Sequence, residues 1–321
     1  MADEDFAQTI ADTLAIIEDK LTEATVSQYS FVTQAAQHVV AAGGKRFRPA
    51  MVVIAAHLGS GFDLTRLINA ALVMELTHVA SLYHDDVMDE ADLRRGVTSA
   101  NRRYGNSTAI LVGDYLFARA SSYVAMLGPE YVDLQARTFA ELVEGQMAET
   151  AGPEAGEDPI EHHFKVLAGK TASLIRASAL FGGMIGGVSA EVLDAVGRFG
   201  LEIGMVFQLS DDLIDIVSDK TGKTPGTDLR EGIPTLPTLL LRSSPSASDH
   251  ELAAFIAGGL DDDGDLAQAL ARLRSSSVID QTRDEINRRA AVARSYLSPL
   301  PAGAAKDALD RLCDEVVTRS S

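Results

Sequence analysis

Cysteine is nearly absent from this chain of 321 residues: Cys313 is the only one, so no disulfide can form within the chain. A lone thiol favours a reducing compartment. Basic residues are also few, because 28 Lys and Arg stand against 46 Asp and Glu, for a formal net charge of −18. That balance argues against nucleic-acid binding and against a basic surface that faces a membrane. Any cations that bind phosphate must therefore be gathered locally.

Aromatic residues make up only 6% of the chain, and runs of β-branched residues bounded by turns are scarce. Neither an internal repeat nor a βαβ pattern is present. Alanine and leucine are abundant, which favours an all-α fold. The length allows one domain or two, and we expect a single helical domain over residues 1–321.

No apolar run is long enough to cross a bilayer, and the opening residues, MADEDFAQTIADTL, are acidic where a signal peptide would be basic. The most apolar segment, 177–190, is short, rich in glycine and bounded by Arg176 and Glu191, which is typical of a buried helix. We therefore expect a soluble, cytoplasmic protein.

Apolar residues recur at helical spacing along most of the chain. Gly43 and Gly44 form a helix stop signal, Pro49 is a suitable first helical residue, and Asp158 is a suitable N-cap. The acidic run 261–265 precedes a helix near residue 266, and we expect it to cap that helix. Helices are predicted over residues 3–24, 28–42, 49–58, 64–90, 107–127, 130–150, from 158 onward, 190–218 and 302–319, with short helices before the last.

The stretch HDDVMDEADLRRG ends an apolar helix in acid. Asp85 and Asp89 lie one helical turn apart and Asp86 about 100° round from Asp85, so three carboxylates converge. A divalent cation would relieve their repulsion, and oxygen donors favour Mg²⁺, which binds through one or two carboxylates plus substrate phosphates. Arg94 and Arg95 follow, and an arginine pair suits bidentate contact with phosphate. The stretch predicts a diphosphate site.

The same spacing recurs in FQLSDDLID, where Asp211, Asp212 and Asp215 again end an apolar run. One such cluster could simply cap a helix or lie in solvent. Two copies favour metal binding. If they face each other across a cavity, they could hold several Mg²⁺ ions on one diphosphate and neutralise it as a leaving group.

Cations gather at three further places. GGKRFRP carries Lys45, Arg46 and Arg48 on a glycine-rich turn, which could hold an anion or be a solvated loop. The pair Lys170 and Thr171 interrupts a small, apolar helix face, although a lone lysine is often simply exposed. The long loop DKTGKTPGTDLREGIPTLP is suited to covering a site, and its cations are Lys220, Lys223 and Arg230.

Together, GGKRFRP, HDDVMDEADLRRG, GKTAS, FQLSDDLID and GKTPGTDL, in this order, resemble a trans-polyprenyl diphosphate synthase of the class I isoprenoid synthase fold. The resemblance covers about residues 40–240. It implies a mostly antiparallel helical bundle around a deep cavity, in a homodimer. It also implies Mg²⁺-dependent elongation: an allylic prenyl diphosphate ionises, its carbocation alkylates isopentenyl diphosphate, and proton loss restores the allylic group.

The resemblance also assigns roles by motif position. It implies metal binding by the carboxylates, substrate binding by the cations, and polar oxygens near the developing carbocation. Principal Mg²⁺ ligands would be Asp85, Asp89 and Asp211, supported by Asp86, Asp212 and Asp215. The allylic diphosphate would contact Arg94, Lys170 and Lys223. Isopentenyl diphosphate would contact Lys45, Arg48, His78 and Arg95. The oxygen atoms near the carbocation would come from Thr171 and Gln208.

One position departs from the family pattern, because Ile233 stands where many relatives have a lysine that contacts the allylic diphosphate. Two rival functions stay open. A class I terpene cyclase also ionises a prenyl diphosphate, but it binds no second diphosphate, so the turn at Lys45 and Arg48 would have no ligand. A regulatory subunit without activity is disfavoured because both aspartate trios are intact.

Product length depends on residues just before the first aspartates. His78, Ser81 and Met74 fall near the face of Asp85, whereas a helical wheel turns Ala80 away from it. Relatives with short products tend to have an aromatic residue at position 80 or 81, and neither residue here is bulky. We therefore expect a long all-trans product, used as a quinone side chain and delivered to a membrane; a farnesyl or geranylgeranyl synthase is the alternative.

Overall fold

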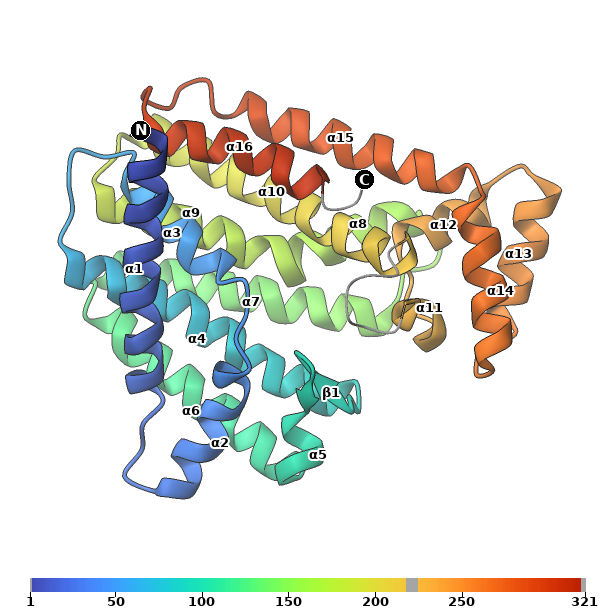
Figure 1. The fold of residues 1–321 in the computed structure, drawn as a ribbon, viewed down its shortest axis with the longest axis horizontal. Coiled ribbons are helices and arrows are strands. Elements are labelled where there is room, and N and C mark those ends of the chain that lie inside the picture. The colour runs from blue at the N-terminus through green and yellow to red at the C-terminus, as the bar shows by residue number, and fades with distance from the viewer. Residues whose placement is uncertain (1, 218–224, 319–321) are drawn as a thin grey trace. The chain divides into compact units, whose positions relative to one another are not determined.

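The computed structural model describes residues 2–217 and 225–318. Nearly all of its regular structure is helical, which confirms the predicted all-α class (Figure 1). The chain divides into two compact units. The first comprises residues up to Ala140 with Leu174–Gly197 and Pro299–Leu309, and the second comprises Glu141–Ser173, Arg198–Ser298 and the residues from Asp310 onward. Each unit is described by itself.

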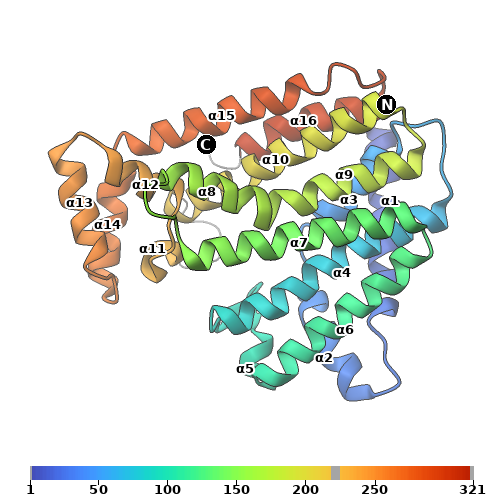
Figure 2. The ribbon, with the colours of Figure 1, turned by 180° about the vertical axis from the view of Figure 1, so that it is seen from behind.

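The first unit is built around α4 (Leu64–Met88), which packs against α1 (Ala2–Ala24), α3 (Phe47–Ala56) and α6 (Asn106–Ala125). Figure 2 shows α4 and α6 running side by side. Their interface is apolar, with Leu72, Leu76 and Leu116 almost completely buried. The unit also contains α2 (Ser30–Ala41), β1 (Leu93–Arg94), β2 (Val97–Thr98), α5 (Ala100–Tyr104), α9 (Ser173–Gly186, from Leu174) and the first parts of α7 (Pro129–Ala151), α10 (Ala190–Val217) and α16 (Ala304–Thr318).

The second unit holds the remaining parts of α7, α10 and α16 and a set of helices that follow one another along the chain. Its own elements are α8 (Pro159–Leu167), the π-helical turn η1 (Ala168–Ala172), α11 (Thr227–Glu231), α12 (Leu236–Ser243), α13 (Ala247–Ala257), α14 (Asp263–Arg274) and α15 (Val278–Ser295). α12 packs against α8, α13 and α15, and α14 packs against α13 and α15.

Local sequence signals explain several helix ends. The side chain of Asp63 accepts a hydrogen bond from the Arg66 amide at 2.9 Å and starts α4. Asp158 caps α8 and Asp262 caps α14 in the same way, as predicted. These caps satisfy amides that have no partner inside their own helix.

Other predictions of local structure were wrong. Pro49 is not the first residue of its helix, because α3 begins at Phe47 after Arg46 in a left-handed conformation, φ 47°. The β-hairpin around the RRG segment, with Leu93 opposite Thr98, was not predicted. A short helix, α11, lies in the long loop, and α15, at 18 residues, is longer than expected.

Within the described ranges, no helix combines the length and hydropathy that a membrane crossing requires. The single-domain prediction stays a prediction.

Candidate functional site

The first aspartate motif occupies the last turn of α4. Asp85 is half-buried, and Asp89 is the exposed residue that ends the helix, its amide donating to the Asp85 carbonyl at 2.8 Å. Asp86 differs from both, because none of its surface is exposed. The three predicted carboxylates therefore divide into two that are accessible and one that is buried.

Asp86 forms an ion pair with Arg94, whose Nε lies 2.6 Å from Oδ1. Its other oxygen accepts a long hydrogen bond, 3.4 Å, from the Ala100 amide. Arg94 reaches Asp86 from β1 because the hairpin turns sharply at Arg95 and Gly96, with φ of 52° and 79°. The hairpin thus joins a predicted diphosphate ligand to the middle aspartate.

Arg95 points from the hairpin to the glycine-rich turn. Its guanidinium donates to the carbonyl of Gly43 and, at 3.3 Å, to that of Val39. A Cβ on Gly44 would lie 3.0 Å from the guanidinium carbon of Arg95, so glycine leaves room for this packing. The structure brings Arg95 and the turn that carries Lys45 together, as the predicted isopentenyl diphosphate site requires.

Arg48 and His78 lie in the same electropositive region. Burial, and then the nearby charge of Arg95, lower the pKa of Arg48 to about 10, while Glu75 opposes the change. Burial also holds the pKa of His78 well below its usual value, helped by Arg48, Arg95 and Arg94. His78 is therefore neutral at pH 7 and can donate one hydrogen bond. Lys45, by contrast, is exposed.

The second motif, on α10, repeats the division found in the first. Asp211 and Asp215 are half-buried, and Asp212 is buried. Burial, together with repulsion from Asp228, Asp211 and Asp215, raises the pKa of Asp212 to about 8. A divalent cation would relieve this repulsion.

A chain of hydrogen bonds connects Thr171 to the second motif. The Thr171 hydroxyl donates to Oε1 of Gln208 at 3.1 Å, and Nε2 of Gln208 donates to Oδ1 of Asp212 at 2.9 Å. Thr171 lies on the π-helical turn η1, a type of distortion often found at functional sites. The structure therefore joins both predicted oxygen donors to a predicted metal-site carboxylate.

Lys170, also on η1, forms an ion pair with Glu149 of α7. The two segments come close because of Gly145: a Cβ there would lie 2.4 Å from the Lys170 amide nitrogen. Both side chains are between a quarter and a third exposed. Lys170 thus has a carboxylate partner, and its contact with a diphosphate stays a prediction.

The long loop is described only in part. Lys220 and Lys223 lie outside the described residues, so the role of Lys223 stays a prediction. Arg230 forms an ion pair with Asp263. Ile233 is partly exposed, and its amide donates to the Asp228 carbonyl at 2.9 Å.

Sequence reasoning missed three ionisable residues. Glu75 interrupts the buried face of α4, and a carboxylate inside an apolar run is the signal that could have found it. Glu149 pairs with Lys170, but no local pattern marks it. His163 is buried with Nε2 3.9 Å from Asp212, and that nitrogen has no hydrogen-bond partner within the described part of the chain.

The residues considered for product length separate in the structure. Ala80 is completely buried in a cluster that also holds residues of α1, α2 and α6. Ser81 is 9% exposed and donates to the His78 carbonyl at 2.8 Å. Met74 is completely buried. Ala80 is thus part of a packed apolar cluster, whereas Ser81 is a buried polar residue that bonds within its own helix.

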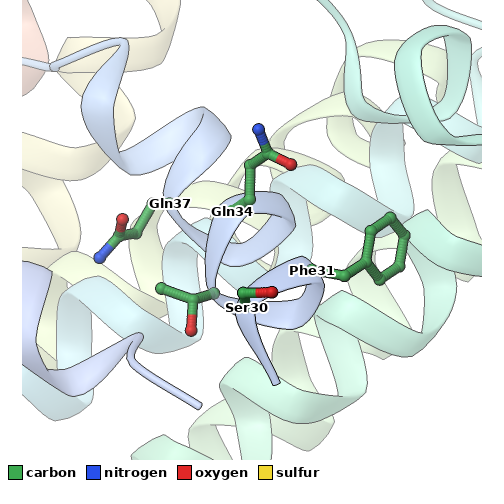
Figure 3. A pocket seen from close by; sticks show the side chains of 5 residues that line it. Ser30, Phe31, Gln34 and Gln37 are labelled. Carbon is green, nitrogen blue, oxygen red and sulfur yellow. The ribbon is translucent and has the colours of Figure 1, made fainter. Parts of the chain in front are cut away.

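A separate hollow lies on α2 (Figure 3). Its described lining contains none of the predicted site residues and consists of Ser30, Phe31, Thr33, Gln34 and Gln37.

Comparisons with known proteins identify the family of this chain. The family model "Polyprenyl synthetase" matches residues 29–273. The chain is 43% identical to the nonaprenyl diphosphate synthase of Mycobacterium tuberculosis (strain ATCC 25618 / H37Rv), over 99% of this chain and 96% of that protein. A geranylgeranyl pyrophosphate synthase of Corynebacterium glutamicum, complexed with calcium and isoprenyl diphosphate, matches with a TM-score of 0.88 and 41% identity, over 99% and 98% of the two chains. A decaprenyl diphosphate synthase of Rhodobacter capsulatus matches with a TM-score of 0.89 and 31% identity, over 99% of each. The chain therefore belongs to the polyprenyl synthetase family and is a prenyltransferase.

Proposed function

We propose that this prenyltransferase elongates an allylic prenyl diphosphate with isopentenyl diphosphate. The carbon–oxygen bond of the allylic substrate breaks, and diphosphate leaves with the bonding electrons. The double bond of isopentenyl diphosphate attacks the resulting carbocation, a carbon–carbon bond forms, and loss of a proton restores an allylic double bond. The observation that carries the proposal is the packing of Arg95 against the glycine-rich turn that carries Lys45, where its guanidinium donates to the Gly43 carbonyl and lies against Gly44. Such a group of cations suits a second diphosphate.

Mg²⁺ is the divalent cation that we propose for the aspartate motifs. No three Asp, Glu, His or Cys side chains within residues 2–217 and 225–318 lie close enough to hold a metal ion alone. Mg²⁺ takes one or two carboxylates and completes its shell with water and substrate phosphates, so it does not require three protein ligands. The carboxylate repulsion around Asp212 supports cation binding. When bound, Mg²⁺ would neutralise the diphosphate leaving group.

The proposal gives separate tasks to the residues of each unit. In the first unit, Asp85 and Asp89 bind metal, and Asp86 holds Arg94 in position. In the second, Asp211 and Asp215 bind metal, and Lys170 exchanges Glu149 for the allylic diphosphate. Thr171 and Gln208 orient Asp212 and place oxygen atoms that stabilise positive charge.

We propose a long product because Ala80 and Ser81, just before the first motif, are both small. Ser81 is small and lies one turn from Asp85 along α4, with Met74 farther back on the same helix. The similarity to nonaprenyl and decaprenyl synthases supports this reading. The similarity to a geranylgeranyl synthase supports the shorter alternative.

We also propose a homodimer. α6 exposes the large apolar side chains of Ile110 and Leu111, which are 43% and 67% accessible. A second copy of the chain would cover these side chains. Light scattering of the wild type and of Leu111→Arg tests the proposal: the wild type should have twice the mass of the chain, and the variant should shift toward the monomer.

Substrate requirement tests the enzymatic proposal. The purified chain is incubated with farnesyl diphosphate, with or without isopentenyl diphosphate, and with Mg²⁺ or excess chelator. We expect new prenyl products only when both substrates and Mg²⁺ are present. Product formed from the allylic substrate alone would favour a cyclase, and no product under any condition would favour a regulatory subunit.

A further inference from the structure

Arg46 lies between two predicted ligands of isopentenyl diphosphate, yet its side chain is directed into the protein. Its Nε and Nη2 donate to the two carboxylate oxygens of Glu18 at 2.6 and 2.7 Å. Nη1 donates to Glu75 at 2.8 Å, and Nη2 also donates to the Val40 carbonyl at 3.0 Å. Four hydrogen bonds thus occupy most of the five N–H groups of the guanidinium.

These partners come from three different helices. Glu18 belongs to α1, Val40 to α2 and Glu75 to α4, so one guanidinium joins three elements at the turn. Burial alone would lower the pKa of Arg46, but the hydrogen bonds to Glu18 and the charge of Glu75 raise it. Arg46 is therefore a fixed cation with little capacity to contact a substrate.

Glu75 is the most buried member of this network, with 2% of its side chain exposed. Its charge also acts on Arg48 and Arg95, where it opposes the effect of burial on both pKa values. A carboxylate at this depth is stable only when cations surround it. Glu75 thus pairs with Arg46 and adds negative charge near Arg48 and Arg95.

The backbone of Arg46 is also constrained, with φ 47° and ψ 35°, a left-handed conformation that is uncommon for residues other than glycine. The surrounding contacts must hold it there. This conformation sets the directions in which the neighbouring Lys45 and Arg48 leave the chain.

We infer that Arg46 and Glu75 are positioning residues for the isopentenyl diphosphate site: the ion pair holds the turn so that Lys45 and Arg48 meet one diphosphate. The inference rests on the proposed function. It assigns Arg46 no contact with substrate, in contrast to its two basic neighbours.

Steady-state kinetics of Arg46→Lys and Glu75→Gln test this inference. Lysine keeps the charge but loses the bidentate geometry, and glutamine keeps the shape but loses the charge. We expect each to raise the KM for isopentenyl diphosphate by about tenfold or more, with the KM for the allylic substrate changed less than about threefold. A general structural defect would instead change both KM values together or reduce kcat alone, and either result overturns the inference.

Arg137→Lys is the matched control, because Arg137 forms an exposed ion pair with Asp133, at 2.5 Å, in the same unit. It should leave both KM values unchanged. If Arg46→Lys does not fold, Glu18→Gln removes the same bidentate contact at a residue that is 42% exposed. Glu18→Gln should raise the KM for isopentenyl diphosphate selectively. If this KM is unchanged in Glu18→Gln, the inference is overturned.

Lys45→Ala and Arg48→Ala distinguish failure of the positioning role from failure of the proposed function. If these two variants selectively raise the KM for isopentenyl diphosphate while Arg46→Lys and Glu75→Gln do not, the positioning role is overturned and the proposed function stays intact. If none of the variants selectively raises the KM for isopentenyl diphosphate, both the assignment of the turn and the inference are overturned.

Discussion

The Nε atom of Arg94 lies 2.6 Å from Oδ1 of Asp86, and that carboxylate has no exposed surface. Asp86 is the middle acid of the first motif, and it neutralises a cation of the hairpin that follows. Asp212, the middle acid of the second motif, is likewise buried and accepts a hydrogen bond from Gln208. In both motifs the outer acids are more accessible, which suits them to bind metal.

Asp85→Ala and Asp86→Ala should therefore differ in stability although both lower turnover. Asp85→Ala removes a proposed metal ligand and should reduce kcat by orders of magnitude with little change in the free energy of unfolding. Asp86→Ala leaves Arg94 without its carboxylate and should cost roughly 1–3 kcal/mol, since Arg94 is partly exposed. Urea denaturation without metal measures this difference. Equal stability of the two variants would contradict the structural role of Asp86.

Lys170, in the second unit, should affect binding of the allylic substrate more than binding of isopentenyl diphosphate. Lys170→Met removes a proposed ligand of the allylic diphosphate and should raise its KM by about tenfold or more, with a smaller effect on isopentenyl diphosphate. Lys165→Met is the control, because Lys165 pairs with Glu157 on an exposed surface of the same unit. An equal rise in both KM values for Lys170→Met would mean that this lysine has no substrate preference.

Ser81 and Ala80 should respond differently to an aromatic side chain. Ser81→Phe should shorten the product, because the residue lies one helical turn before Asp85 of the first motif. Ala80→Phe should instead destabilise the fold by roughly 1–3 kcal/mol through overpacking. Chromatography of dephosphorylated products and thermal unfolding measure the two effects. An Ala80→Phe variant as stable as wild type, with shorter products, would reverse the assignment.

Cys313 offers an independent report of folding for all these variants. The residue is 1% exposed, and burial raises the pKa of its thiol to about 11, so little thiolate exists at pH 8. Iodoacetamide should therefore label the native chain very slowly and the urea-unfolded chain rapidly, as read by mass spectrometry. Rapid labelling of the native chain at pH 8 would contradict the buried position of this thiol.

Much of the helical structure follows from local sequence patterns. Apolar spacing predicted α4 and α6 to within two residues at each end, and the caps at Asp158 and Asp262 follow from their side chains. The hairpin was missed because its strands are only two residues long and its turn places Arg95, not asparagine or aspartate, at positive φ.

Long-range pairing limited the prediction of the site. Arg46 and Glu75 are 29 residues apart, and Lys170 and Glu149 are 21 apart, so no local pattern joins them. The motifs identified which residue types carry chemistry. They could not distinguish Arg46, held by internal carboxylates, from its neighbours Lys45 and Arg48, because packing decides which side chain turns inward.

The length of the wild-type product tests the central claim most directly. The chain is incubated with Mg²⁺, farnesyl diphosphate and excess isopentenyl diphosphate, and the dephosphorylated products are measured by mass spectrometry. Elongation predicts a series of masses that differ by one isoprene unit and end well above twenty carbons. A product that lacks this series would contradict prenyl elongation, and a series that stops at fifteen or twenty carbons would contradict the long-chain assignment.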